Sequence, residues 1–170
     1  ESNTFETDYS LNDSLTYYLE KANDDNLSIS IKRKLNYKAL EIVQKQPNDS
    51  SSRASLFKVA NRFFNINDWE SFKIVSKDVL EKALEKKDTI FIAKSYSYIG
   101  DFYSSQGNSD SAYVYYYKAE KLYSLFNDDL NLARTLLNKA LLQFNESDFL
   151  GSERAVIKAL RAVKGRNSND

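Results

Sequence analysis

The 170-residue sequence predicts an all-α protein of eight helices arranged in four pairs. Three observations lead to this prediction. The chain matches itself without gaps at a shift of 40 residues. Apolar residues recur at the i, i+3, i+4 and i+7 spacing of amphipathic helices. With 4 glycines and 1 proline, the chain has little turn-forming sequence for a sheet.

The shift of 40 residues divides the chain into repeated units. Residues 55–63 fall on residues 95–103, and residues 135–143 follow after the same interval. Four units are expected near residues 11–46, 51–87, 88–127 and 128–165, with polar tails at both ends. We expect residues 1–170 to form a single domain, since each unit would bury its apolar face against its neighbours.

The ends of the expected helices follow from polar breaks in the pattern. Pro47 marks the end of the second helix of the first unit, because proline inside a helix removes a hydrogen bond. Breaks at 65–68, 106–110 and 145–148 separate the helices inside the later units, and 46–52, 87–89 and 127–129 separate the units. The predicted helix-capping residues in the inner breaks are Asp68, Ser109 or Asp110, and Asp148. Residues 113–117 favour a strand locally, but the surrounding helical period overrides that preference.

Small and aromatic residues recur in fixed columns of the third unit. They are Tyr96, Ile99, Gly100, Tyr103, Gly107, Ala112, Tyr116 and Ala119. This pattern resembles the tetratricopeptide repeat (TPR). The small residues Gly100, Ala112 and Ala119 would lie where helices approach most closely. The resemblance implies a right-handed α-solenoid of four antiparallel helix pairs, with a 40-residue period longer than the usual ~34 of the family.

The other three units follow the columns less closely. Phe72 in the second unit and Lys139 in the fourth stand where small residues are expected, and Glu20 and Lys32 break the first unit. A looser resemblance connects residues 13–22 and the repeats after them to bacterial TPR sensor regions. Those regions often precede a membrane span and a histidine kinase or helix-turn-helix output domain.

The TPR resemblance implies a binding surface, because the first helices of such units line a concave groove. The candidate groove residues are Tyr17, Phe57, Asn61, Phe64, Lys94, Tyr98, Asp101, Arg134, Asn138 and Leu141. Aromatic rings would hold apolar side chains, while Asn61, Asn138 and Arg134 would hold a peptide backbone or a carboxylate. The alternative is that Phe57, Phe64 or Leu141 simply packs against neighbouring helices.

The expected function is that of a protein- or peptide-binding module, in the sensory or interaction region of a larger bacterial signalling protein. A free-standing scaffold that bridges protein partners is the alternative. A second copy could also cover the last helix, whose apolar residues Phe149, Val156, Leu160 and Val163 lack a following polar helix. The compartment stays open between an extracytoplasmic location and the cytoplasm.

Composition argues against several other classes of protein. Without histidine or cysteine, the chain lacks the commonest general base and the commonest zinc ligands, so no catalytic residue, metal or cofactor is expected. The 24 basic and 24 acidic residues give no net charge, which disfavours nucleic-acid binding. A tyrosine cluster at 113–123 is expected to be structural, since a surface that stacks bases would need basic residues interleaved with the rings and none is expected there. No apolar stretch reaches the ~20 residues of a membrane span.

Overall fold

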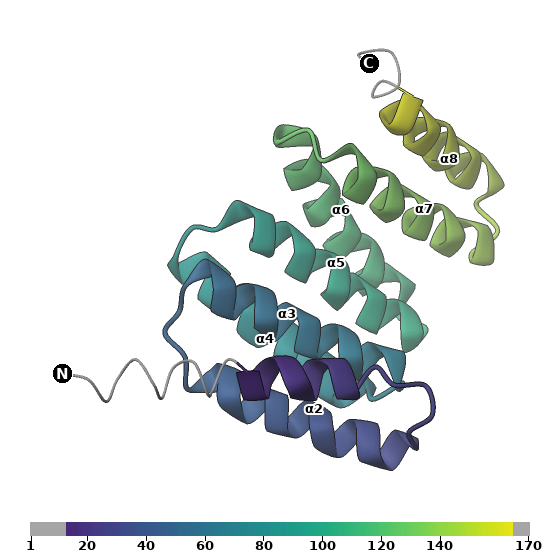
Figure 1. Ribbon diagram of the computed structural model, residues 1–170. Helices are drawn as coiled ribbons and strands as arrows, with labels where there is room; N and C mark the ends of the chain where they lie inside the picture. The colour runs from purple at the N-terminus through teal and green to yellow at the C-terminus, as the bar shows by residue number, and fades with distance from the viewer. Residues whose placement is uncertain (1–12, 165–170) are drawn as a thin grey trace. The chain divides into compact units, whose positions relative to one another are not determined.

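The computed structural model describes residues 13–164, and every regular element in this range is a helix (Figure 1). A first helical segment covers residues 13–21. The following helices are α2 (Ile29–Gln44), α3 (Ser50–Asn65), α4 (Trp69–Glu85), α5 (Thr89–Ser105), α6 (Ser109–Leu125), α7 (Asp129–Asn145) and α8 (Phe149–Lys164). The all-α prediction is confirmed for these residues. The predicted polar tails lie outside them.

Five helix junctions share one backbone conformation, which explains the period of the sequence. A residue with positive φ ends each helix from α3 to α7, and these residues are Asn67, Lys87, Gly107, Asn127 and Ser147. The backbone N–H of the next residue then bonds to the carbonyl five positions earlier, as from Asp68 to Phe63 at 3.0 Å. Successive junctions are 20 residues apart, so two helices with their junctions span the 40-residue repeat.

The residue after each positive-φ position also caps the next helix. The Asp68 carboxylate accepts from the Ser71 N–H at 3.3 Å, and Asp148 accepts from the Gly151 N–H at 2.9 Å. Both caps were predicted. The prediction of Ser109 or Asp110 as the cap of α6 is wrong, because Asn108 accepts from the Ser111 N–H at 3.0 Å. The left-handed turn at Gly107 fixes the cap at the following position.

The chain divides into two compact units, with the boundary inside α4 between Lys82 and Ala83. In the first unit, the buried side of α3 supplies Leu56, Val59, Ala60 and Phe63. Tyr37 of α2 contacts the Phe63 ring edge-on at 5.1 Å and shares a 2.7 Å hydrogen bond with Ser71 of α4. Neighbouring helices of this unit are therefore joined by both apolar and polar contacts.

In the second unit, each helix packs against the next, from α5 to α8. The shared core consists of Ala93, Ala119, Tyr123, Leu132, Ala133, Leu136 and Ala159. Gly100 allows the closest approach between α5 and α6, because a Cβ atom there would lie 2.6 Å from the Tyr116 ring. The small residue expected at this helix contact is thus required by the packing.

Candidate functional site

The predicted groove residues of the first unit differ in how far they can reach a ligand. The Phe64 ring contacts both Trp69 and Phe72 edge-on, at 5.3 Å between centroids in each case. Phe57 is half-buried. Phe64 therefore packs against its neighbours, as the sequence allowed, and helps to join α3 to the start of α4.

Tyr17 is exposed in the same unit, whereas Asn61 is half-buried like Phe57 and Phe64. Tyr17 is 56% exposed and meets the Tyr18 ring at 5.4 Å. Asn61 accepts a hydrogen bond from Asn65 at 3.3 Å, one helical turn further along α3. Of the four predicted residues in this unit, Tyr17 presents the most open surface.

In the second unit, the structure brings two predicted residues, Asp101 of α5 and Asn138 of α7, into direct contact. The Asn138 amide donates to the Asp101 Oδ1 atom at 3.0 Å. The Tyr116 hydroxyl of α6 donates to the same oxygen at 2.7 Å. Within residues 13–164, no donor is found for the second carboxylate oxygen, Oδ2, so this oxygen is left to accept from a ligand.

The electrostatics of this cluster follow from its burial. Burial raises the pKa of Asp101 to about 6, while the Tyr116 and Asn138 hydrogen bonds and the Arg134 charge oppose the shift. Burial and the neighbouring Asp101 raise the pKa of Tyr116 above its usual range. Two neutral donors hold the carboxylate through Oδ1, and within residues 13–164 the positive charge of Arg134 also favours its ionised form.

The surroundings of the cluster combine charge with exposed apolar surface. Arg134 and Leu141 are exposed on α7, with Leu137 between them on the same helical face. The Lys94 ammonium lies 5.0 Å from the centre of the Phe91 ring, whereas Tyr98 is buried. A polar centre bordered by exposed leucines suits an extended peptide with a backbone to hydrogen-bond and side chains to bury.

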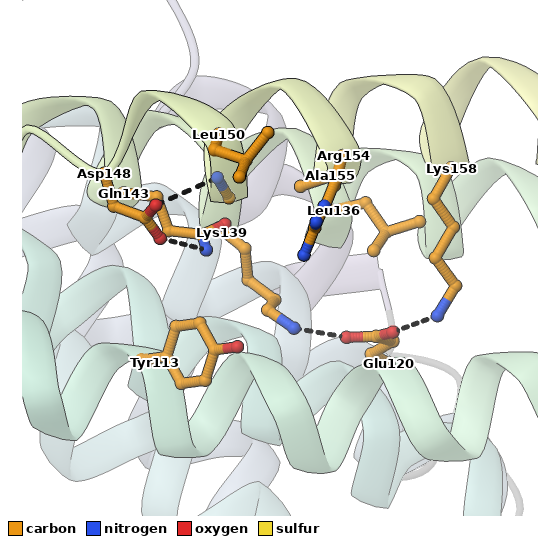
Figure 2. A pocket seen from close by; sticks show the side chains of 11 residues that line it. Tyr113, Glu120, Leu136, Lys139, Gln143, Asp148, Leu150, Arg154, Ala155 and Lys158 are labelled. Atoms are coloured by element: carbon orange, nitrogen blue, oxygen red, sulfur yellow. Dashed lines mark hydrogen bonds and ion pairs between the residues drawn. The ribbon is translucent and has the colours of Figure 1, made fainter.

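A second polar centre was not among the predicted sites. It is a pocket of about 380 Å³ between α6, α7 and α8. Figure 2 shows that Lys139 of α7 and Lys158 of α8 both point at Glu120 of α6. The Lys139 ammonium lies 2.6 Å from Glu120 Oε2, and the Lys158 ammonium lies 2.5 Å from Oε1. Although burial opposes ionisation, these two lysines hold the pKa of Glu120 below its usual value.

The sequence did carry a signal for this pocket. Lys139 stands where a small residue was expected, and the structure shows a buried lysine paired with a buried glutamate. Lysines also lie over the exposed tyrosines of α6. The Lys139 ammonium is 4.6 Å from the centre of the Tyr113 ring, and the Lys121 ammonium is 4.8 Å from that of Tyr117. The expectation that no basic residues accompany the tyrosine cluster is therefore wrong, because lysines from α6 and α7 lie over its rings.

Two further features of residues 13–164 concern membranes and metal ions. No helix in this range is both long enough and apolar enough to cross a bilayer. No group of three or more potential metal-ligating side chains comes together there. Phe149 and Leu160 of α8 are exposed, and the contact with a second copy through this helix stays a prediction.

Comparisons with known proteins bear on the fold. No protein-family model matches the sequence, and no curated protein matches it. Among solved structures, the crystal structure of BtubC (BKLC) from P. vanneervenii is similar, with a TM-score of 0.70 and 19% sequence identity. The match covers 82% of this chain and 58% of the length of BtubC. This likeness supports the all-α fold and nothing about ligands.

Proposed function

We propose that the chain is a protein- or peptide-binding module of TPR-like helix pairs, stacked as a right-handed α-solenoid. The 20-residue spacing of the helix junctions and the close contact at Gly100 support this architecture. The module would act by binding, without a cofactor, as the interaction region of a larger bacterial signalling or regulatory protein. A free-standing adaptor would use the same surface.

One observation carries the proposal. The Asp101 carboxylate is held by Tyr116 and Asn138 through one oxygen, which leaves the other oxygen available to accept a peptide N–H. The side chains of Arg134 and Leu141 lie on the neighbouring face of α7. They would pair with a carboxylate or carbonyl of the peptide and cover an apolar side chain.

Selection from a random-peptide library displayed on phage, with the whole chain immobilised, tests the proposal. A selected peptide is then titrated calorimetrically into the protein and its variants. Arg134→Gln and Leu141→Ser should each weaken binding by about tenfold, because each removes a side chain that would contact the peptide. Both side chains are exposed, so their loss should leave the core intact.

Arg161→Gln is the matched control, since Arg161 is an exposed arginine on α8, outside this face. Its affinity should stay within about twofold of the original chain. Equal losses in the Arg161 and Arg134 variants would show unspecific charge attraction and would count against the proposed site. Failure to select any peptide that binds saturably would favour the adaptor with folded partners.

A further inference from the structure

The pocket at Glu120 is the middle of a longer groove in the second unit. A neighbouring hollow of about 260 Å³ shares Tyr113, Gln143 and Asp148 with it. A third hollow, of about 480 Å³, shares Glu120 and Lys158 with it. The three hollows adjoin one another at these shared residues, and helices α6, α7 and α8 supply most of their lining.

The groove has the dimensions of an extended peptide. Its α6 side runs from Ser109 to Leu125, which is ~24 Å at about 1.5 Å per helical residue. An extended segment of roughly seven residues covers that length at ~3.3 Å per residue. Tyr113 and Tyr117 are 40% and 45% exposed along this side, so apolar side chains of the segment would have rings to contact.

The charges in the middle of the groove are unbalanced. Lys139, Lys158 and Arg154 line the pocket together with only two acidic residues, Glu120 and Asp148. The Asp148 carboxylate caps α8 and also accepts a hydrogen bond from the Gln143 amide at 2.9 Å. Glu120 already binds both lysines. Neither carboxylate is therefore left for the guanidinium of Arg154.

Among the three cations that line the pocket, Arg154 has no anionic partner within residues 13–164. Across the part of the chain that the structure describes, it has no hydrogen bond or ion pair, and Figure 2 shows its side chain among the pocket residues. It lies four residues before Lys158 on α8, so two like charges stand one helical turn apart on one face. Such a pair is destabilising unless an anion lies near both.

We propose that this groove binds an extended acidic peptide segment, with a carboxylate of the segment received between Arg154 and Lys158. Lys158 can turn towards such a carboxylate because its side chain is 57% exposed. Lys139 is only 8% exposed and stays with Glu120, which keeps that buried carboxylate neutralised. This site is separate from the Asp101 face and does not depend on the proposed function.

Fluorescence anisotropy with fluorescein-labelled hexaglutamate and the full chain tests the proposal, with labelled hexaglutamine as the uncharged reference. Hexaglutamate should bind saturably, and hexaglutamine should not. Arg154→Gln should weaken hexaglutamate binding by about tenfold, since a charge-assisted bidentate hydrogen bond is lost. Its side chain is exposed, so the fold should be retained.

Two matched variants locate the binding. Arg161→Gln removes an equal charge from the same helix outside the groove, and Arg134→Gln removes one from the Asp101 face. Both should keep hexaglutamate affinity within about twofold of the original chain. The two proposals can fail separately. If hexaglutamate does not bind but a phage-selected peptide still needs Arg134 for binding, this proposal is overturned and the proposed function stays intact.

Three results would contradict the acidic-peptide assignment. The first is the absence of saturable hexaglutamate binding at low salt. The second is an equal loss of affinity in the Arg154 and Arg161 variants, which would indicate diffuse attraction to a basic helix. The third is displacement of the peptide by inorganic phosphate but not by acetate, which would assign the pocket to a phosphate group instead.

Discussion

Two carboxylates of the second unit, the half-buried Asp101 and the buried Glu120, are held in opposite ways. Asp101 receives the neutral donors Tyr116 and Asn138, and its pKa is raised to about 6. Glu120 receives two lysine ammonium groups, and its pKa is lowered. Both side chains lose water on folding, so burial alone does not decide the direction of the shift.

The difference shows what each site can offer a partner. Two lysine ammonium groups bind Glu120 and favour its ionised form, so this carboxylate serves the structure and the pocket around it has surplus positive charge. Neutral donors compensate Asp101 incompletely, so its charge remains costly until a ligand supplies a further donor. The first setting suits an acidic ligand, and the second suits a ligand with N–H groups.

The largest expected effect comes from removing the cation that holds Glu120. Lys139→Met should lower the free energy of unfolding by about 3 kcal/mol, because a buried carboxylate then keeps only the exposed Lys158. Urea denaturation measures this effect, with the exposed Lys77→Met as control. Adding Glu120→Gln to the Lys139 variant should recover most of the loss. Equal instability of the double variant would contradict a charge-based role.

The next effect concerns the Tyr116 ring, whose hydroxyl donates a hydrogen bond to Asp101. Gly100→Ala should destabilise the fold by about 2 kcal/mol, since the added methyl group would meet the Tyr116 ring 2.6 Å away. The higher helix propensity of alanine offsets only about 1 kcal/mol of such strain. Thermal unfolding provides the measurement, and a variant as stable as the original chain would show that this contact is loose.

The pH dependence of stability sharpens the comparison further. Because the folded-state pKa of Asp101 is about 6 and its ordinary value is 3.8, the folded chain binds more protons between these pH values. Its contribution to the free energy of unfolding therefore falls as the pH rises through this window. The lowered pKa of Glu120 acts oppositely, and its contribution is lost as the pH falls below the ordinary glutamate value of 4.5.

Asp101→Asn should accordingly gain on the order of 2 kcal/mol over the original chain at pH 7.5, and little at pH 4. Urea denaturation at the two pH values measures the difference. Asp110→Asn, at an exposed position of α6, is the matched control. A gain that does not depend on pH would mean that Asp101 is not the titrating group.

The smallest effect extends the comparison to a buried polar side chain whose amide group makes no hydrogen bonds to the described part of the chain. Asn36 of α2 is fully buried, and within residues 13–164 its amide oxygen and nitrogen have no hydrogen-bond partner. Asn36→Leu should therefore stabilise the fold by about 1 kcal/mol, as unpaired polar atoms are replaced by apolar ones of similar size. A loss of stability in urea denaturation would indicate that the amide is satisfied in solution.

The sequence predicted the helices well because their ends depend on local chemistry. Residues 65–68 and 145–148 were expected as breaks, and a left-handed residue followed by an aspartate cap is found in each. The cap of α6 was misplaced by one or two positions, since Asn, Ser and Asp in succession are all good caps. Only the backbone turn at Gly107 selects Asn108.

The candidate sites were predicted less completely because they depend on contacts between helices. Asp101 and Asn138 were both named from the repeat columns, and the hydrogen bond between them follows from the packing of α5 beside α7. Tyr116 was named only as a member of the repeat columns, and the structure shows that its hydroxyl donates to Asp101. The Lys139–Glu120 ion pair joins α7 to α6. The repeat columns do not show which residues of these two helices lie opposite each other, so the pair could not be predicted.

The most direct test of the central claim is an NMR titration of the isotope-labelled chain with a phage-selected peptide. If the Asp101 face, formed by Asp101 of α5 and by Arg134, Asn138 and Leu141 of α7, is the binding surface, three signals should shift together. They are the side-chain amide signal of Asn138 and the methyl signals of Leu137 and Leu141. The methyl signals of Leu150, in the Glu120 pocket, should stay in place. Shifts confined to Leu150, or shifts at none of these residues, would contradict the account.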